Sequence, residues 1–283
     1  MKTAVVTGAA GGIGAAICRR LAADGFAVAC LDFREADLTA LAKELAGQVR
    51  AAGVSGGSAP GASAAGGSGG SAPHASAAGG SGGSAPRVGT ARGYSADVRD
   101  PASVRLPAER IRQDLGEPWL LVNAAGVFSI QLLPDLDERE WDRIVDTNLK
   151  GPFLTCREFL PAMIRAHDGC IVNVASTAGV RGGRRRAAYC ASKGGLVLLT
   201  RSLAMDHGPD GVRVNCVCPG LIDTEMADWI RHDAAAMAKF DASTPIGRIG
   251  SPAEIAAAVS FLASADASYL MGAVLMADGG VTA

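Results

Sequence analysis

The segment TAVVTGAAGGIG, residues 3–14, decides the fold of this chain. Its apolar first half predicts a buried strand, and its glycines lead directly into a helix-length stretch. Gly8 is placed to make a tight turn, Gly12 to let backbone amides approach a ligand, and Gly14 to let the helix pack closely on the strand. Because the amino end of a helix favours phosphate charge, this segment predicts a site for a dinucleotide pyrophosphate.

The rest of the chain alternates between two periodicities. Beyond the first strand, apolar runs predict strands at residues 27–32, 92–97, 119–126, 170–176, 212–220 and 273–280. Helix-length stretches are residues 12–24, 34–46, 101–115, 137–166, 187–207 and 252–264. Ser251, Pro252 and Glu254 predict the capped start of the last helix. Apolar strands that alternate with helices predict a single α/β domain, a doubly wound parallel sheet of about seven strands with helices on both faces.

Residues 51–90 interrupt this alternation. They hold 13 Gly, 11 Ala, 8 Ser and 3 Pro, and the segment ASAAGGSGGSAP occurs twice, at 62–73 and at 75–86. This composition cannot bury enough apolar area to offset chain entropy, so we expect a flexible loop, with a partner-binding or assembly segment as the alternative. Helix-to-strand connections lie at the amino ends of parallel strands, so this tract should lie opposite the ligand site.

Charge and cysteine content narrow the class of protein. The chain has 27 Lys and Arg against 28 Asp and Glu, which gives no global electrostatic reason to bind nucleic acid or an anionic membrane. No window holds the ~18 apolar residues that span a bilayer, and glycines interrupt the apolar run that might pass for a signal peptide. The seven cysteines include Cys216 and Cys218 on one strand face, without a second ligand pair. We therefore expect buried thiols, no metal and a cytoplasmic location.

Asp32 predicts the choice of dinucleotide. It ends the second predicted strand 18 residues after Gly14, where a carboxylate can bind ribose hydroxyls and repel a 2′-phosphate. Residues 9–11 contain no basic side chain, so we expect NAD rather than NADP, although Arg34 could complicate that preference. A helix-capping or loop role for Asp32 stays open. Asp97, at the end of the third strand, could meet the adenine edge or cap the next helix.

Tyr189 and Lys193 predict acid–base chemistry. They lie four residues apart on a predicted helix and therefore share one face. A lysine ammonium beside a phenol favours the phenolate and lowers the tyrosine pKa, which makes Tyr189 a proton donor or acceptor. Ser176 ends a strand 13 residues earlier, where its hydroxyl could bind a substrate oxygen or form a local cap.

The order of the motifs resembles that of the short-chain dehydrogenase/reductase family, whose fold is of the Rossmann type. The motifs are TGAAGGIG (7–14), NAAG (123–126), Asn148 in DTNLKG, Ser176 in NVAS, YCASK (189–193) and PGLIDT (219–224). The resemblance covers the chain apart from residues 51–90. It implies NAD(P)-dependent interconversion of an alcohol and a carbonyl compound. Ala124 replaces the second Asn common in the NNAG motif of the family, which we expect to matter little.

The resemblance also implies residue roles. Tyr189 would be the general acid/base, Ser176 would orient the carbonyl oxygen, and Lys193 would hold the nicotinamide ribose. Asn148 would hold a water of the proton relay. The other implied cofactor contacts are Gly8, Gly12, Ile13 and Gly14 at the pyrophosphate, Asp32 at the adenosine ribose, Asp97 and Val98 at the adenine, Asn123 at the central strand, and Pro219, Gly220, Ile222 and Thr224 at the nicotinamide carboxamide.

The substrate stays open. Arg181, Arg184, Arg185 and Arg186 could recognise an anionic group or form a solvated or subunit-facing loop. Residues 221–245 predict an amphipathic lid, and the helices at 137–166 and 187–207 resemble those that build homotetramers in the family. The leading hypothesis is an NAD-dependent oxidoreductase of secondary alcohols and ketones. The alternatives are an NADPH-dependent 3-oxoacyl-thioester reductase, acting on acyl carrier protein or CoA thioesters, and a non-catalytic nucleotide-sensing protein.

Overall fold

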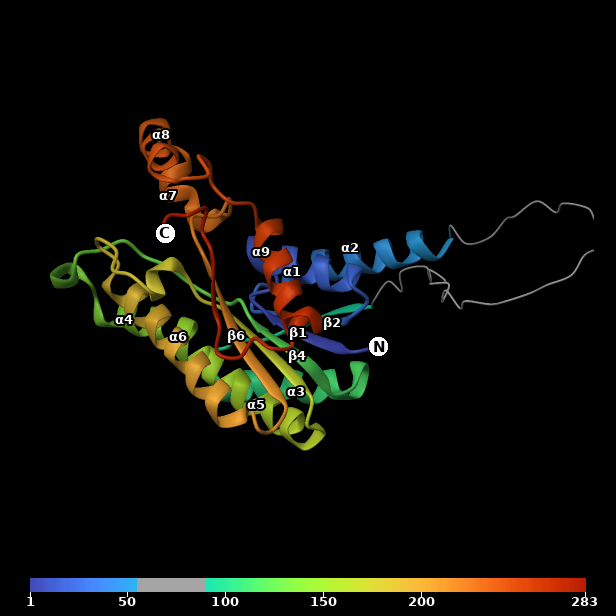
Figure 1. Cartoon of the computed structure of the whole chain (residues 1–283). Helices are drawn as coiled ribbons and strands as arrows, with labels where there is room; N and C mark the ends of the chain where they lie inside the picture. The colour runs from blue at the N-terminus through green and yellow to red at the C-terminus, as the bar shows by residue number, and fades with distance from the viewer. Residues whose placement is uncertain (55–89) are drawn as a thin grey trace, which may run out of the picture.

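A single parallel sheet forms the centre of the molecule. The computed structural model describes residues 1–54 and 90–283, apart from the side chains of residues 48–54 and Lys239. Within that part of the chain, seven strands lie in the order β3-β2-β1-β4-β5-β6-β7 (Figure 1). They are β1 (Thr3–Thr7), β2 (Ala27–Asp32), β3 (Ala91–Ser95), β4 (Pro118–Asn123), β5 (Gly169–Val174), β6 (Val212–Pro219) and β7 (Val274–Ala277). The order reverses between β1 and β4, where a doubly wound sheet binds its ligand.

Helices cover both faces of the sheet, which confirms the predicted doubly wound α/β domain. On one face lie α1 (Gly12–Ala23), α2 (Glu35–Val54) and α9 (Pro252–Ala263); on the other lie α3 (Pro101–Leu115), α5 (Gly151–Ala166) and α6 (Ala187–His207) (Figure 1). The remaining helices are α4 (Glu138–Val145), α7 (Asp228–Arg231) and α8 (Ala234–Ser243). Helices α7 and α8 follow β6 and belong to residues 221–245, the segment that is predicted from the sequence to be a lid and that is called the lid below.

The apolar side chains of the strands pack into two cores, one on each face of the sheet. Successive side chains of a strand point to opposite faces, so Val6 packs in the core beneath α1, α2 and α9, whereas Val5 packs in the core beneath α3, α5 and α6. All five residues of β1 are buried. Burial on both faces explains why the strands read as continuous apolar runs.

Several predicted boundaries are wrong. Strand β4 ends at Asn123, three residues before the end of its predicted range, 119–126. The stretch 137–166 is not one helix, because a π-helical turn, Asp146–Lys150, separates α4 from α5. The last strand is only four residues long, since Gly279 and Gly280 leave it with φ of 66° and 87°. Helix α2 continues to Val54, four residues into the low-complexity tract, because Ala51 and Ala52 favour helix. The expected flexibility of residues 55–89 lies outside the described residues.

Side chains fix several helix starts, among them those of α9 and α3. The Ser251 hydroxyl accepts from the Glu254 amide at 3.4 Å, and the Glu254 carboxylate accepts from the Ser251 amide at 2.7 Å, which confirms the predicted cap of α9. At α3, the Asp100 carboxylate accepts from the amide of Ala102 at 3.0 Å.

A chain of polar side chains crosses the buried middle of the sheet. The Thr155 hydroxyl donates to Asn123 Oδ1 at 2.6 Å, and Asn123 Nδ2 donates to Asn173 Oδ1 at 2.9 Å. Asn173 Nδ2 donates in turn to the Thr200 hydroxyl at 2.9 Å, and that hydroxyl donates to the Leu196 carbonyl. This amide network joins α5, β4, β5 and α6.

The cysteines form no disulfide, and all except Cys190 are buried. Cys216 and Cys218 pack in the same cluster, as expected for alternate residues of one strand. In the described parts of the chain, no group of three or more His, Cys, Asp or Glu side chains is arranged to hold a metal. None of the helices described is both long enough and apolar enough to cross a membrane.

Candidate active site

A cleft of about 810 Å³ lies at the carboxyl ends of the strands. Its walls come from the turn after β1, the ends of β2 and β3, the loop after β4, helix α4 and the lid. The predicted site residues that line it are Gly8, Gly12, Ile13, Gly14, Asp32, Asp97, Val98 and Thr224. It also contains residues not predicted, including Phe33, Phe128, Arg143 and Thr147.

The turn after β1 leaves backbone where side chains would fill the cleft wall. Gly8 has a φ of +65°, and a Cβ there would lie 2.6 Å from Cα of Ala125. A Cβ on Gly14 would overlap the carbonyl of Gly8, so helix and turn can pack only without it. Helix α1 begins at Gly12 with no side chain capping its first amides. This cradle fits a pyrophosphate, whose oxygens would accept from those amides.

Asp32 lies at the cleft wall beside this turn. Its side chain is buried, and its two carboxylate oxygens accept from the backbone amides of Ala10 and Arg34, each at 3.0 Å. The bond with Arg34 shows that Asp32 also shapes the turn into α2, so the loop role and a ribose-binding role are compatible. The carboxylate fits the hydroxyl pair of an adenosine ribose.

Arg34 is surrounded by carboxylates. Its guanidinium lies 3.6 Å from Asp32, 3.4 Å from Asp37 and 3.5 Å from Glu225. Glu225 belongs to the lid, so this arginine joins the β2–α2 loop to the lid beside the cleft. Three negative groups compensate its single positive charge.

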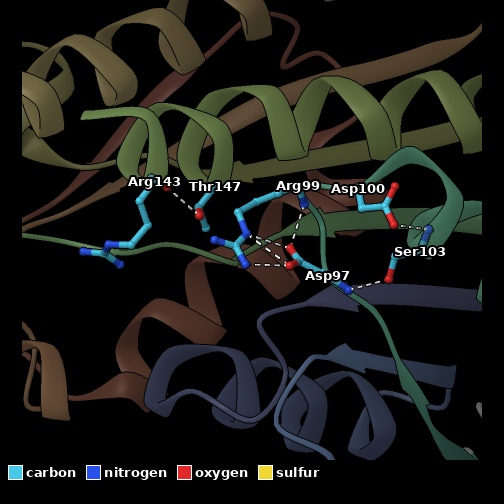
Figure 2. A network of polar contacts seen from close by, with 6 residues as sticks. All are labelled: Asp97, Arg99, Asp100, Ser103, Arg143 and Thr147. Atoms are coloured by element: carbon cyan, nitrogen blue, oxygen red, sulfur yellow. Dashed lines mark hydrogen bonds and ion pairs between the residues drawn. The ribbon is translucent and has the colours of Figure 1, made fainter. Parts of the chain in front are cut away.

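The end of the cleft beside β3 contains Asp97 and Arg99. Arg99 donates to both carboxylate oxygens of Asp97, at 2.7 Å for the shortest contact, and this pairing holds the pKa of Asp97 below its usual range (Figure 2). The Asp97 amide donates to the Ser103 hydroxyl at 2.8 Å. Asp100, and not Asp97, caps α3, so the capping alternative for Asp97 is wrong.

Arg143 reaches the cleft from α4. Its guanidinium forms two hydrogen bonds with the Glu140 carboxylate, at 2.6 and 2.7 Å, which raise the pKa of Arg143. Its backbone carbonyl accepts from the Thr147 hydroxyl at 2.7 Å (Figure 2). Sequence spacing alone gave no sign that either residue borders the cleft.

Tyr189 and Ser176 come together behind Phe128. Tyr189 lies in the first turn of α6, and Ser176 follows β5. Burial raises the pKa of Tyr189, and the nearby Ser176 hydroxyl and the charge of Arg186 oppose that rise. The ring of Phe128 meets that of Tyr189 edge to face at 5.0 Å. Ser176 also accepts from the Ala178 amide at 3.1 Å, so it is a local cap as well.

Lys193 lies one helical turn beyond Tyr189 and is buried. Its Nζ donates to the Val174 carbonyl at 2.8 Å and lies 5.9 Å from the centre of the Tyr189 ring. Burial lowers the pKa of Lys193 to about 8. The expected lowering of the Tyr189 pKa by Lys193 is not found in this structure, because burial of the phenol dominates and the ammonium points at a carbonyl.

Asn148 stands in the π-helical turn between α4 and α5. Its Oδ1 accepts from the Val127 amide at 2.8 Å, and its Nδ2 donates to the Val127 carbonyl at 2.9 Å and to the Ser192 hydroxyl at 3.1 Å. A Cβ on Gly126 would meet both Asn148 Oδ1 and Lys193 Nζ at 3.5 Å. Asn148 and Lys193 therefore lie directly behind the cleft wall at Gly126.

Four other residues predicted to contact the cofactor do not line the cleft. Asn123 is buried in the amide network and does not line the cleft. Pro219 ends β6, and a Cβ on Gly220 would meet Asp278 Cα at 2.9 Å. Ile222 faces Gly250 and lines a separate cavity of about 290 Å³. The structure thus brings Thr224, but not these four residues, to the cleft.

The four arginines before α6 have different environments. Arg181 donates to the Val281 carbonyl at 3.0 Å, and Arg184 and Arg185 are exposed. Arg186 alone turns inward, with its guanidinium carbon 5.3 Å from the ring centre of Phe128 and 5.1 Å from that of Trp229. Phe128 was not identified from the sequence as a site residue. Only its position, two residues after the NAAG motif, could have indicated it.

Comparison with protein families agrees with this geometry. Residues 2–58 match the family model described as short chain dehydrogenase, and residues 80–282 match the model described as Enoyl-(Acyl carrier protein) reductase. The chain belongs to the short-chain dehydrogenase/reductase family. It is an NAD(P)-dependent oxidoreductase that acts on alcohol and ketone substrates.

Known relatives differ in substrate. The chain is 41% identical to 2-(S)-hydroxypropyl-CoM dehydrogenase 3 of Xanthobacter autotrophicus over 68% of its own length and 77% of the relative's. It is 35% identical to D-threitol dehydrogenase of Mycolicibacterium smegmatis, covering 99% and 93%. It is 38% identical to a 3-oxoacyl-acyl-carrier-protein reductase of Salmonella typhimurium, covering 67% and 77%. A solved structure described as a putative gluconate dehydrogenase from Agrobacterium tumefaciens superposes with a TM-score of 0.82 at 25% identity, covering 99% and 95%.

Proposed function

We propose that this protein is an NAD-dependent dehydrogenase that interconverts a secondary alcohol and a ketone, with Tyr189 as general acid/base. The observation that carries the proposal is the proximity of Tyr189 and Ser176 behind Phe128, which lines a cleft whose glycine turn and Asp32 fit a dinucleotide. A non-catalytic nucleotide sensor would have no use for a phenol placed next to a hydroxyl beside that cleft.

The protein's own contribution is to hold the substrate oxygen and to move one proton. A nicotinamide bound in the cleft supplies the hydride acceptor or donor. Ser176 donates to the substrate oxygen and orients it towards Tyr189. Because burial raises the pKa of Tyr189, the phenol is protonated near neutral pH and can give its proton to a ketone oxygen. In the reverse direction the phenolate removes the alcohol proton.

Lys193 and Asn148 support this proton transfer. The Lys193 ammonium, whose pKa is about 8, is positioned behind Gly126, where it would bind ribose hydroxyls. Asn148 holds the π-helical turn against Val127 and would anchor a water through which the proton reaches solvent.

The charges around Asp32 favour NAD over NADP. A 2′-phosphate would meet the Asp32 carboxylate directly. Arg34, the nearest cation, is shared among Asp32, Asp37 and Glu225, so it offers no net positive charge to a phosphate. This arrangement supports a preference for the dinucleotide that lacks the phosphate.

Replacement of Asp32 tests that preference. Asp32→Ala should raise the KM for NAD about 10-fold or more and lower that for NADP, because the ribose loses its acceptor and Arg34 loses one counter-charge. Steady-state kinetics with both cofactors measures the change. Asp37→Ala, which removes a carboxylate from Arg34 without touching the cleft wall, is the control. An unchanged ratio of the two kcat/KM values in Asp32→Ala would refute the assignment.

Replacement of Tyr189 tests the proton transfer. Tyr189→Phe should lower kcat at least about 100-fold while NADH binding, followed by nicotinamide fluorescence, stays within twofold. In the wild-type enzyme, alcohol oxidation should rise with pH above neutrality, because oxidation requires the phenolate. Retained turnover in the Phe variant would overturn the role of Tyr189.

A 3-oxoacyl-thioester reductase is the second candidate, favoured by the relative from Salmonella typhimurium. Acetoacetyl-CoA and 2,3-butanediol, assayed with both cofactors, separate the two. Preference for acetoacetyl-CoA with NADPH would replace the proposal made above.

Assembly and location are further parts of the proposal. Phe153 on α5, and Leu198 and Met205 on α6, expose 46%, 64% and 82% of their surface, which is unusual for apolar side chains on two long helices. We infer that α5 and α6 bury these side chains in a homotetramer. The seven free thiols fit the reducing conditions of the cytoplasm.

A further inference from the structure

The arginines that line the cleft are already paired. Arg34 meets three carboxylates, Arg99 is bound by Asp97, and Arg143 by Glu140. The charge of each guanidinium is compensated by these carboxylates, and Arg99 and Arg143 also donate hydrogen bonds to them. These arginines are therefore not free to recognise an anion on a substrate.

Arg186 is different. Its Nε is buried with no hydrogen-bond partner, and its guanidinium forms no hydrogen bond or ion pair within residues 1–54 and 90–283. A buried donor without a partner costs free energy and is rare in folded proteins. An arginine cannot relieve that cost by losing its proton, because it stays charged in proteins. A ligand that enters the cleft could supply this partner.

The side chain is held in place by packing. Phe128 and Trp229, which both line the cleft, present their rings to the guanidinium at 5.3 and 5.1 Å. On the backbone, the Arg185 carbonyl accepts from the Gln131 amide at 2.9 Å, which ties the arginine loop to the loop after β4. The guanidinium is thus positioned before any ligand binds.

The acidic side chains of the lid around Trp229 bind elsewhere. Asp223 and Asp228 each bind Arg231, at 3.0 and 3.1 Å, and Glu225 lies 3.5 Å from Arg34. Asp233 accepts from the amides of Ala235 and Ala236 at the start of α8. None of these four carboxylates forms an ion pair with Arg186 in the described part of the chain.

We propose that Arg186 binds a carboxylate or similar oxyanion on the substrate, so that the preferred substrates are hydroxy acids and their oxo acids. This inference rests on the proposed function of the same site. The ring of Phe128 contacts both Tyr189 and Arg186, so the proton-transfer residue and the guanidinium are neighbours across one ring. A substrate whose oxygen meets Tyr189 can therefore place an anion at Arg186 only a few bonds away.

Matched ketones test the proposal. Levulinate and 5-oxohexanoate are compared with their methyl esters, which have the same ketone but no charge, in NADH-dependent reduction. Wild-type enzyme should prefer the acids. Arg186→Met keeps the length and apolar packing of the side chain, and it should raise the KM for the acids about 10-fold or more while changing the esters less than about twofold.

Arg184→Met is the matched control, because Arg184 belongs to the same run but is exposed. It should leave acids and esters unchanged. Equal losses for acids and esters in Arg186→Met, or a wild-type enzyme that prefers the esters, would overturn the proposal.

A binding measurement separates this proposal from the proposed catalytic function. Trp229 lies against Arg186, so its fluorescence should change when levulinate is titrated into the protein with NAD present, and Trp229→Phe identifies the signal. The change should be absent in Arg186→Met. If no ketone is turned over, the proposed dehydrogenase fails, whereas a fluorescence titration that is the same in wild type and Arg186→Met overturns the role of Arg186.

Discussion

Lys193 serves the proposed site, but its burial lowers the stability of the folded protein. Its ammonium is buried, and its hydrogen bond to the Val174 carbonyl only partly replaces water, so its pKa falls to about 8. The depressed pKa means that folding disfavours the charged form. The charged form is nevertheless the one that can bind a ribose.

Lys193→Met should therefore stabilise the ligand-free protein at pH 7 by about 1–3 kcal/mol and abolish turnover. The cost of burying the ammonium is fully present below pH 8, where folded and unfolded states are both protonated. It fades as pH rises towards 10.5, where the unfolded lysine also loses its proton. The advantage of the variant should shrink over that range.

Urea denaturation of wild type and variant between pH 7 and 10 measures the difference. Lys43→Met, at an exposed lysine of α2, should show no such trend. A Lys193→Met protein that is less stable than wild type at every pH would contradict the explanation.

Local spacing predicted some site residues and missed others for a physical reason. Tyr189 and Lys193 share a helix face because of the 3.6-residue period, which is visible in the sequence. The difference between Arg186 and Arg184 is not visible there, because it arises from packing against Phe128 and Trp229, which come from distant loops. From charge and spacing alone, the four arginines could not be distinguished as candidates for anion binding.

At the scale of elements, the lid rests on the start of α1. A Cβ on Gly12 would lie 2.6 Å from Cγ2 of Thr224, so the two segments touch through that methyl group. Together with the contact between Arg34 and Glu225, this places the lid against both the glycine turn and the β2–α2 loop. The position of the lid therefore depends on the absence of a side chain at Gly12.

Gly12→Ala should lower the free energy of unfolding by about 1–3 kcal/mol through this overlap. Adding Thr224→Ser removes the methyl group and should recover most of the loss. A double-mutant cycle by urea denaturation measures the coupling, which should exceed about 0.5 kcal/mol. Thr224→Ser alone is the control, and purely additive effects would show that the two residues do not meet.

The elements themselves were largely predictable. Most strands were found from apolar runs, because a parallel sheet covered on both faces buries its central strands. The edge strand β3 is the exception, since most of its residues are exposed or half-buried. The π-helical turn was missed, since the helical period of residues 137–166 continues through it and its cause is the bond between Asn148 and Val127, 21 residues apart. Tertiary contact decides such a turn, not local propensity.

For the whole molecule, the low-complexity tract joins the body far from the cleft. Helix α2 ends at Val54, and Ala91 begins β3 at the amino edge of the sheet, whereas the cleft lies at the carboxyl edge. Replacing residues 56–88 by a short Gly-Ser linker should therefore leave kcat/KM within about twofold and the melting temperature within a few degrees.

Steady-state kinetics and thermal denaturation of the shortened protein check this expectation. Tyr189→Phe in the same shortened chain should remain inactive, which excludes a contaminating activity. A large loss of turnover would instead favour an assembly or partner-binding role for the tract.

The amide network has a consequence for how the chain finds its fold. Strands β4 and β5 are apolar on both faces, so sliding one along the other would still bury apolar surface. Asn123 and Asn173 are directly opposite each other in the native alignment. Any slip would leave two side-chain amides in the interior without hydrogen-bond partners. Each unpartnered amide costs about 1–3 kcal/mol. These asparagines therefore fix the register of β4 against β5 and disfavour misaligned pairings as the sheet assembles.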